Sequence, residues 1–374
     1  MRPIESQWMD AVDTVAREVL RQDRTGDALA EAVAELSRVY TRDRRRLRDQ
    51  EAALAARLRF FLPRDLPKVE YPLSELHRVG ALPSRRTWRV LDLGAGLGTT
   101  HLGVARFAAR TGAADGLSVR AIERSARSLR IAEALAPHAG LPVELDTRTG
   151  DMTRPILGEW DLIVVGLSLN ELWGGAPDRV ERRAAWIAGL LKRLAPDGSL
   201  IVVEPALREV TRDLQAVRDR LAEHVFAPCT QCGPCPMLPR AKDWCHQWLA
   251  VDLPESLRPV AKAAGLRWRG LSFAYLTLRR DGRRLSEALR VVDGPRPSKG
   301  VTTWTLCGAP GLVELRHLDR HARPGDVLDG AVRGTLLTVE PTPAPGGRLR
   351  SDRVSLVSAT EEAGAEQEVE QLEE

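Results

Sequence analysis

The stretch Val90-Leu91-Asp92-Leu93-Gly94-Ala95-Gly96-Leu97-Gly98 decides the expected fold of this chain of 374 residues. Its apolar first half reads as a short buried strand, and its glycines read as a tight turn before a helix. Glycine has no Cβ, so it adopts backbone angles that other residues avoid and lets a ligand approach the main chain. A strand, glycine turn and helix in this order are typical of Rossmann-like folds, and NAD- and FAD-binding proteins use a similar turn.

Apolar runs recur at regular intervals after this turn, and helix-like stretches separate them. The predicted strands are 117–123, 142–151, 160–168 and 199–206, with late strands at 271–280 and 301–307. The predicted helices are 99–110, 125–136, 177–195, 207–223 and 254–265. Strands that alternate with helices predict βαβ units, and therefore an α/β fold whose mostly parallel sheet has helices on both faces.

Acidic side chains stand where the first three strands of this pattern end. Asp92 lies two residues before the first glycine, Glu123 ends the second strand, and Asp151 and Met152 follow the third. A carboxylate at the position of Glu123 can accept hydrogen bonds from both vicinal hydroxyls of a ribose. An acid at the position of Asp151 can accept one from an adenine amino group, while Met152 packs on the ring.

The stretch from about 86 to 206 resembles the class I S-adenosylmethionine-dependent methyltransferases, which have a Rossmann-like core with a mostly parallel seven-stranded sheet. The resemblance implies that the aspartate and glycine turn hold the amino-acid part of the cofactor, and that the next two strand ends hold its ribose and adenine. The implied residues are Asp92, Gly94, Ala95, Gly96, Gly98, Glu123, Asp151 and Met152. Two alternatives stay open: the loop binds NAD, or the fold is intact but no longer binds a cofactor.

The element after the fourth strand normally lines the pocket for the methyl acceptor. Methyltransferases that act on exocyclic amino groups carry an (Asp/Asn)-Pro-Pro-(Tyr/Phe) run there, whereas this chain has Ser168-Leu169-Asn170-Glu171. Asn170 and Glu171 are the candidate catalytic residues. They either orient an acceptor or cap the helix that follows, and the sequence does not assign the acceptor.

Four of the five cysteines lie close together on a segment rich in proline and glycine. They are Cys229, Cys232, Cys235 and Cys245, and the fifth is the distant Cys307. A large chain without a signal peptide is not expected to use them as a disulfide framework, so a metal site is the favoured interpretation. Thiolates suit zinc or an iron–sulfur cluster. The triple at intervals of three, with proline after its last member, favours iron–sulfur ligation.

With these cysteines, the chain from about 50 to 315 resembles the Rsm-twenty-two-like family of methyltransferase-like proteins, whose mitochondrial members act in assembly of the small ribosomal subunit. The matching pieces are Ala52–Pro63, Cys229-x₅-Cys235-Pro236, Trp244-Cys245-His246, Ser272–Leu276 and Cys307–Gly311. The resemblance implies a [4Fe–4S] cluster on Cys229, Cys235, Cys245 and Cys307. Cys232 stands where the family has a polar residue, so it is an alternative ligand, and zinc is the alternative metal.

Composition sets limits on the class of protein. Hydrophobic residues make up 43% of the chain, and no stretch reaches the roughly 18 uninterrupted apolar residues of a membrane helix. The net charge of +4 averages an arginine-rich body with an acidic tail that carries seven of the glutamates, in residues 361–374. The segment Arg38–Arg48 is either a solvated helix face or a face that contacts phosphate.

These patterns predict four parts, and the family resemblance implies one leading function. A helical N-terminal extension covers 1–85, and a methyltransferase core with a cysteine-rich insert at 226–250 covers 86–310. A small β-rich appendage covers 311–358, and a disordered acidic tail covers 359–374. We expect a cytoplasmic, monomeric S-adenosylmethionine-dependent methyltransferase that acts on small-subunit ribosomal RNA. The alternative is a non-catalytic assembly factor that docks on the assembling small subunit with the same fold.

Overall fold

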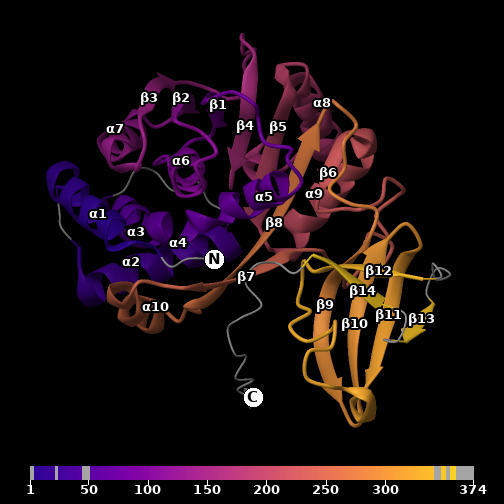
Figure 1. The fold of residues 1–374 in the computed structure, drawn as a ribbon. Coiled ribbons are helices and arrows are strands. Elements are labelled where there is room, and N and C mark those ends of the chain that lie inside the picture. The colour runs from indigo at the N-terminus through magenta and orange to yellow at the C-terminus, as the bar shows by residue number, and fades with distance from the viewer. Residues whose placement is uncertain (1–3, 22–23, 44–50, 341–346, 351–353, 359–374) are drawn as a thin grey trace. The chain divides into compact units, whose positions relative to one another are not determined.

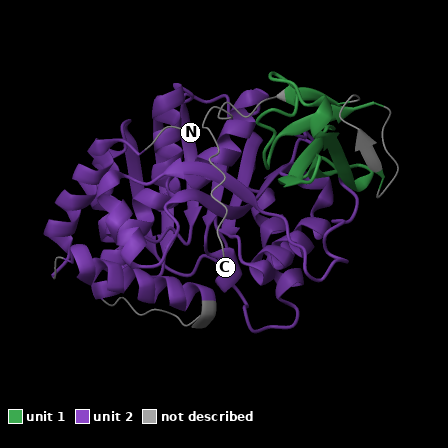
Figure 2. Ribbon diagram, turned by 90° about the horizontal axis from the view of Figure 1, so that it is seen from below, with its two compact units in different colours: residues 1, 229–231, 286–374 green, residues 2–228, 232–285 purple. Residues whose placement is uncertain are grey.

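The computed structural model describes residues 4–21, 24–43, 51–340, 347–350 and 354–358. These residues form two compact units, which Figure 2 colours separately. The larger unit comprises 2–228 and 232–285, and the smaller comprises 1, 229–231 and 286–374. The predicted acidic tail lies outside the described residues, as does the second half of the predicted arginine-rich segment. Within the described residues, every helix is too short or too polar to span a bilayer.

Helices dominate the first part of the larger unit and alternate with strands after residue 87. The helices are α1 (Ser6–Val19), α2 (Gly26–Arg38), α3 (Glu51–Ala56), α4 (Leu62–Asp65), α5 (Pro67–Arg78), α6 (Thr99–Thr111), α7 (Ala126–Leu135), α8 (Arg179–Leu191), α9 (Arg208–Arg220) and α10 (Arg258–Ala263). The strands are β1 (Thr87–Leu93), β2 (Gly116–Glu123), β3 (Val143–Thr149), β4 (Trp160–Gly166), β5 (Leu194–Pro205), β6 (Val225–Ala227), β7 (Gln247–Asp252) and β8 (Arg269–Arg279).

The strands of the larger unit form one sheet in the order β3-β2-β1-β4-β5-β8-β6, and β7 also pairs with β8. The first five are parallel, and β8 runs antiparallel to β5. The mostly parallel Rossmann-like sheet is therefore confirmed, with β7 as a strand beyond the seven expected. Because parallel crossovers are right-handed, the reversal of order at β1 and β4 puts α6 and α7 on one face and α8 and α9 on the other (Figure 1).

Within the larger unit, the N-terminal helices pack against α10 through an apolar cluster. Leu29, Val33 and Leu36 of α2 and Phe60 lie buried with Val260 of α10. Apolar residues at helical spacing form the buried face of α2, which explains why this segment folds as an amphipathic helix. The larger unit thus includes the helices that precede the sheet.

The smaller unit is built from β9 (Leu289–Ser298), β10 (Val301–Gly308), β11 (Gly311–Leu318), β12 (Leu336–Val339), β13 (Arg348–Arg350) and β14 (Val354–Ser358). Its strand order is β13-β11-β10-β9-β12-β14. Alternate residues point inward, so that Trp304 and Leu306 of β10 pack with Val313 and Leu315 of β11. This separate sheet begins upstream of the boundary at 310 that the sequence predicts, because β9 and β10 pair with β11 and not with the core sheet.

Candidate functional site

The glycine turn lies between β1 and α6, as the sequence predicts. Gly94, Gly96 and Gly98 all have positive φ angles, of 73°, 55° and 87°. At Gly94 a side chain is also excluded by space, because a Cβ would lie 2.6 Å from Oγ of Ser168 and 3.1 Å from Sδ of Met152. The turn therefore keeps its main chain close to the ends of β3 and β4.

Asp92 is fully buried beneath this turn. Its Oδ2 accepts hydrogen bonds from Nδ1 of His101, at 2.8 Å, and from the His101 backbone N–H, at 3.3 Å. Among the described residues, Asp92 Oδ1 and His101 Nε2 are buried without a hydrogen-bond partner. Sequence reasoning missed His101, since a histidine in the first turn of a helix carries no motif. It holds Asp92 in place and leaves one carboxylate oxygen able to accept from an ammonium group.

The Glu123 carboxylate joins the end of β2 to the glycine turn. Its Oε2 accepts a hydrogen bond of 3.0 Å from the backbone N–H of Gly96, and its Oε1 accepts one of 3.0 Å from Ser125. A carboxylate has about four lone-pair positions, so two remain to accept from ribose hydroxyls. The structure thus places Glu123 beside the glycine turn.

Asp151 and Met152 follow β3, at the same edge of the sheet as the ends of β1 and β2. The Asp151 carboxylate accepts from the backbone N–H of Thr153, at 2.9 Å, from its hydroxyl, at 2.8 Å, and from Arg124, at 2.6 Å. The two hydrogen bonds from Thr153 and the pairing with Arg124 lower the pKa of Asp151 to about 2. Met152 is buried next to Gly94.

Together these residues fit an S-adenosylmethionine molecule. The orphaned Asp92 Oδ1 suits the amino group of its methionine part, and the open lone pairs of Glu123 suit its ribose. At Gly96 no atom lies within 4 Å of the position that a Cβ would take, so the main chain of the turn is open to a ligand there.

The loop after β4 is held by two buried groups. Asn170 donates both its backbone N–H and its side-chain amide to Glu204, at the end of β5. Arg183 of α8 donates to the carbonyl oxygens of Asn170, at 2.7 Å, and Leu172, at 3.0 Å. Asn170 does not cap α8, which begins at Arg179 after Asp178.

Glu204 is a second residue that sequence reasoning missed, although its strand was expected. The side chain is 1% exposed, and burial raises its pKa to about 7 despite the two hydrogen bonds from Asn170. Lys68 of α5 is also buried, and its Nζ lies 3.0 Å from Oδ1 of Asp65. Burial lowers the pKa of Lys68, although the negative charges of Asp65 and Glu204 act in the opposite direction. Glu171 is exposed.

In the larger unit, α9 holds the segment with Cys232, Cys235 and Cys245. Both oxygens of Asp219 accept from the backbone N–H of Cys235, at 3.0 and 3.1 Å. Arg218 pairs with Asp219 and donates to the carbonyl of Gly233.

In the second half of this segment, several backbone carbonyl groups accept hydrogen bonds from one guanidinium group. Arg212 donates to the carbonyl oxygens of Leu238, at 2.7 Å, and of Arg240 and Asp243, both at 2.9 Å. The indole of Trp244 donates to the carbonyl of Ala206 at 3.1 Å. Side chains of α9 therefore satisfy a loop that has little regular hydrogen bonding of its own.

Cys229 and Cys307 belong to the smaller unit. Thr230 packs beside Gly308, where a Cβ would lie 3.5 Å from the Thr230 hydroxyl oxygen. The segment with Cys229 therefore lies against the end of β10 that carries Cys307. In the part of the chain that the structure describes, no group of three or more His, Cys, Asp or Glu side chains is arranged to hold a metal ion. The donor set fits soft-metal chemistry, since all five candidates are thiols.

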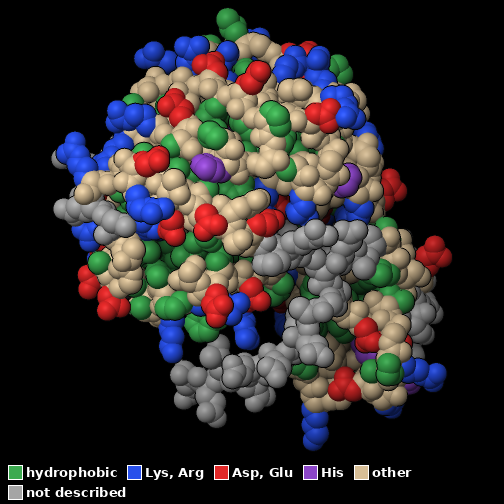
Figure 3. Space-filling view, turned by 60° about the vertical axis from the view of Figure 1, so that its left-hand side comes forward, with side chains coloured by type: hydrophobic (Ala, Val, Ile, Leu, Met, Phe, Trp, Pro, Cys, Tyr) green, Lys and Arg blue, Asp and Glu red, His purple; other side chains and the backbone are tan. Residues whose placement is uncertain are grey.

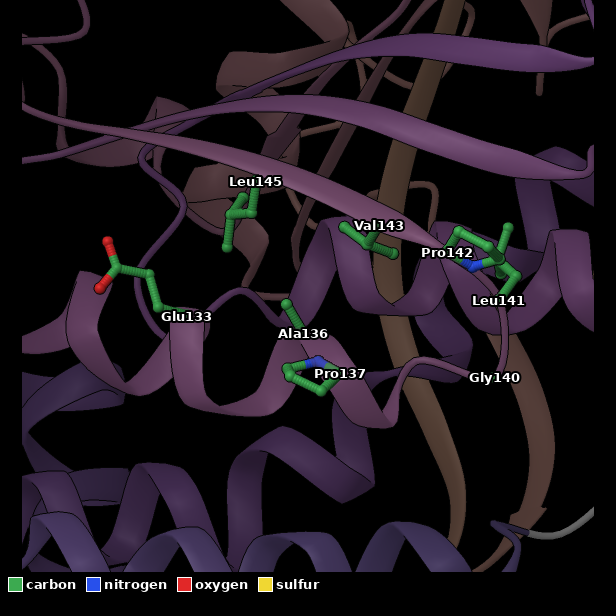
Figure 4. Close-up of a pocket in the computed structure, with 8 residues that line it drawn as sticks. All are labelled: Glu133, Ala136, Pro137, Gly140, Leu141, Pro142, Val143 and Leu145. Carbon is green, nitrogen blue, oxygen red and sulfur yellow. The ribbon is translucent and has the colours of Figure 1, made fainter.

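A hollow of about 430 Å³ lies between the end of α7 and the start of β3 (Figure 4). Its lining is mostly apolar: Glu133, Ala136, Pro137, Gly140, Leu141, Pro142, Val143 and Leu145. None of the predicted site residues lines it.

Comparison with known proteins gives a family and a set of distant structural likenesses. The profile described as "Mitochondrial small ribosomal subunit Rsm22" matches residues 73–331. No curated protein matches the chain.

The solved structures with some likeness include methyltransferases. One from Listeria monocytogenes, assigned as a class I S-adenosylmethionine-dependent methyltransferase, is 12% identical with a TM-score of 0.36, over 74% of this chain and 88% of that chain. One of an assigned RNA methyltransferase from Pyrococcus horikoshii is 11% identical with a TM-score of 0.34, over 67% and 97%. Magnesium protoporphyrin IX methyltransferase from Synechocystis, with bound S-adenosylmethionine, is 16% identical with a TM-score of 0.30, over 59% and 85%.

These structural likenesses are too low to carry a conclusion about activity. The family profile, in contrast, spans the core sheet from α5 onward and continues through β9, β10 and β11. It covers more than half of the chain, and on that match the chain belongs to the Rsm22 family.

Proposed function

We propose that this chain is an S-adenosylmethionine-dependent methyltransferase-like protein that acts on the small ribosomal subunit, through its RNA or during its assembly. The observation that carries the cofactor assignment is the bond from the Gly96 N–H to Glu123, because it ties the ribose-binding carboxylate to the glycine turn. The family description supports the ribosomal partner. A monomer acting on RNA is the simplest form of this proposal.

The roles of the site residues follow from their contacts. Asp92, fixed by His101, accepts from the amino group of the cofactor. Glu123 accepts from the ribose hydroxyls, and Asp151 with Met152 encloses the adenine. The backbone of Gly94 and its neighbours lies beside the methionine part.

When bound, S-adenosylmethionine supplies a methyl group that its sulfonium already activates. The remaining task of the protein is to align the acceptor and take up its proton. Asn170 and Glu171 lie on the loop that lines the acceptor side in this fold. Glu204 acts as a positioning residue, because it fixes that loop through Asn170.

A non-catalytic assembly factor is the second candidate, and one observation favours it. The side-chain amide of Asn170 already donates to Glu204, and its backbone carbonyl already accepts from Arg183. The loop also lacks the proline-proline-aromatic run of amino methyltransferases. In this version the fold binds RNA and presents a docking surface without transferring a methyl group.

Two measurements separate the candidates. Calorimetry with S-adenosylmethionine on the wild type and on Asp92→Ala tests the pocket, and no binding by the wild type would rule out the enzyme. Modification mapping of small-subunit RNA in a deletion strain tests transfer. A lost methyl group that returns with the wild type and not with Asp92→Ala supports the enzyme, whereas unchanged modification with impaired assembly supports the factor.

We further propose that Cys229, Cys235, Cys245 and Cys307 hold a [4Fe–4S] cluster, with Cys232 as an alternative ligand and zinc as the alternative metal. Cysteine thiolates are the usual ligands of such clusters, and the spacing favours iron. Bound, the cluster would be ligated by the sulfur atoms of these cysteines. Its role would be structural, since metal binding and local folding are coupled.

A further inference from the structure

We propose that the smaller unit carries a binding site of its own for single-stranded RNA, at the end formed by the β9–β10 hairpin and the turn after β11. The proposal goes beyond the proposed function, because it needs neither S-adenosylmethionine nor the cysteines. It rests on the strand topology of the unit and on three exposed cations.

The topology is that of a five-stranded Greek-key barrel. Strands β9, β10 and β11 form an antiparallel meander, and β12 returns to pair with β9. β13 pairs parallel with β11, and β14 pairs antiparallel with β12. Together, β13 and β14 make the pairings that the last strand of such a barrel makes, parallel to the third strand and antiparallel to the fourth. This is the strand order of the oligonucleotide- and oligosaccharide-binding barrel.

Barrels of this topology bind many kinds of ligand, and the side chains on the surface determine which one binds. In such barrels, oligonucleotides bind on the face of the second and third strands and on the loop between the first and second. The corresponding parts here are β10, β11 and the turn at Lys299 and Gly300. The barrel interior is excluded as a site because Trp304, Leu306 and their neighbours fill it.

The basic residues Lys299, Arg320 and Arg323 gather at one end of this face. The backbone N–H of Asp319 donates to the carbonyl of Gly300 at 3.2 Å, which brings the residues next to Lys299 and Arg320 together. Arg323 follows directly after the short turn η7 (Asp319–His321). All three cations are exposed, and Figure 3 shows Lys and Arg side chains projecting from the lowest part of this unit.

The carboxylates at this end are engaged locally, and among the residues that the structure describes the only side-chain hydrogen bond of the three cations is from Nε of Arg320 to Nε2 of His321, at 3.2 Å. Asp326 accepts from the backbone N–H of Arg323 at 2.8 Å, and Asp319 accepts from the hydroxyl of Thr302 at 3.4 Å. Within the described residues, Lys299, Arg320 and Arg323 form no ion pair with a carboxylate. Their positive charge is therefore available to a polyanion, which favours RNA over an uncharged saccharide.

The residues of this unit also indicate how the RNA would be bound. Trp304 is the only Phe, Tyr or Trp from residue 286 to the C-terminus, and it is 4% exposed. Bases therefore have no exposed Phe, Tyr or Trp ring to stack on in this unit, unlike in most single-strand-binding barrels. The contacts must be made mainly to phosphate, so we expect binding that depends weakly on sequence and strongly on salt.

The test is fluorescence anisotropy of the full chain with a labelled single-stranded oligouridine of about ten nucleotides, within the site size of one barrel. The tip variant combines Lys299→Glu, Arg320→Glu and Arg323→Glu. The matched control combines Arg78→Glu, Arg130→Glu and Arg208→Glu, which are exposed arginines of the larger unit. Both variants change the net charge equally, so a general electrostatic effect would appear in both.

We expect the tip variant to bind about tenfold more weakly, and its plot of log affinity against log salt to be shallower by about 2, the value for three phosphate contacts on a single strand. The control variant should keep the wild-type slope. Equal losses in both variants, or none in the tip variant, would overturn the proposal. A milder variant with Gln at the same three positions guards against misfolding, and it should show a loss in the same direction.

Two further measurements test whether the site prefers single-stranded RNA and whether it is independent of the cofactor pocket. Duplex RNA of the same length should compete poorly, and competition equal to that of the single strand would overturn the single-strand assignment. Glu123→Ala should leave the anisotropy titration unchanged. Failure of the cofactor pocket would therefore be seen in calorimetry alone, and failure of the RNA site in anisotropy alone.

Discussion

The carboxylate of Glu123 accepts a hydrogen bond from the backbone N–H of Gly96 at 3.0 Å, and this single contact joins two predicted parts of one pocket that lie 27 residues apart in the chain. Sequence places one residue at the end of a strand and the other in a turn. Their contact means that replacing the carboxylate affects both the ligand and the shape of the turn.

We expect Glu123→Ala to weaken S-adenosylmethionine binding by about ten- to hundredfold, as hydrogen bonds to a charged group typically contribute. Calorimetry measures the change. Glu144→Gln, an exposed site on β3, should bind like the wild type. Unaltered affinity in Glu123→Ala would show that Glu123 does not bind the ribose of the cofactor.

Gly94→Ala should be more damaging than its size suggests. The new methyl group would lie 2.6 Å from Oγ of Ser168, at a φ of 73° that L-residues rarely adopt. Gly80→Ala is the matched control, since Gly80 has a φ of 60° and open space around its Cβ position. The control should lose roughly 1–2 kcal/mol for its backbone angle. In denaturant unfolding, Gly94→Ala should lose more than this, together with cofactor binding; equal losses would show that the contact with Ser168 relaxes freely.

Glu204 should make the larger unit less stable as the pH rises. Its folded pKa, about 7, lies above the ordinary glutamate value of 4.5, so between these values the folded state holds a proton that the unfolded state has released. Stability therefore falls between about pH 4.5 and pH 7, by on the order of 3 kcal/mol for this group. Glu204→Gln should remove this loss, and its melting temperature should exceed that of the wild type at pH 8 more than at pH 5. Wild-type pH dependence in the variant would show that Glu204 stays ionised throughout.

Replacing the cysteines one at a time should distinguish those that bind the metal from those that do not. After anaerobic purification, Cys235→Ser, Cys245→Ser and Cys307→Ser should each lose iron and its broad visible absorbance, while Cys232→Ser retains both. Iron, zinc and sulfide analysis makes the measurement. Iron lost from Cys232→Ser but kept by Cys235→Ser would exchange their roles, and stoichiometric zinc without visible absorbance would replace the cluster by a zinc site.

The core sheet was predictable because its signals are local. Alternating apolar and helical stretches predict the strands β1 to β5 and their mostly parallel sheet, and the glycine run predicts the turn after β1. The strand β8 is observed at Arg269–Arg279, close to the predicted 271–280. The hydrophobic pattern of each such segment indicates its secondary structure without reference to its partners.

The parts that were missed depend on contacts between distant residues. The prolines and glycine in Asp293-Gly294-Pro295-Arg296-Pro297 conceal β9, because proline normally argues against a strand. The barrel depends on the pairing of Leu336 with Arg290, which no local pattern reveals. Glu204 likewise becomes notable only beside Asn170, 34 residues away in the chain.

The hydrogen bonds from Arg212 have a consequence for engineering. Carbonyl groups of the segment around Leu238, Arg240 and Asp243 are satisfied by a side chain from α9, and Cys235 is fixed by Asp219 of the same helix. The cysteine segment is therefore not a portable motif. Transplanting it into another protein would require α9 to travel with it, as a graft of helix and loop together.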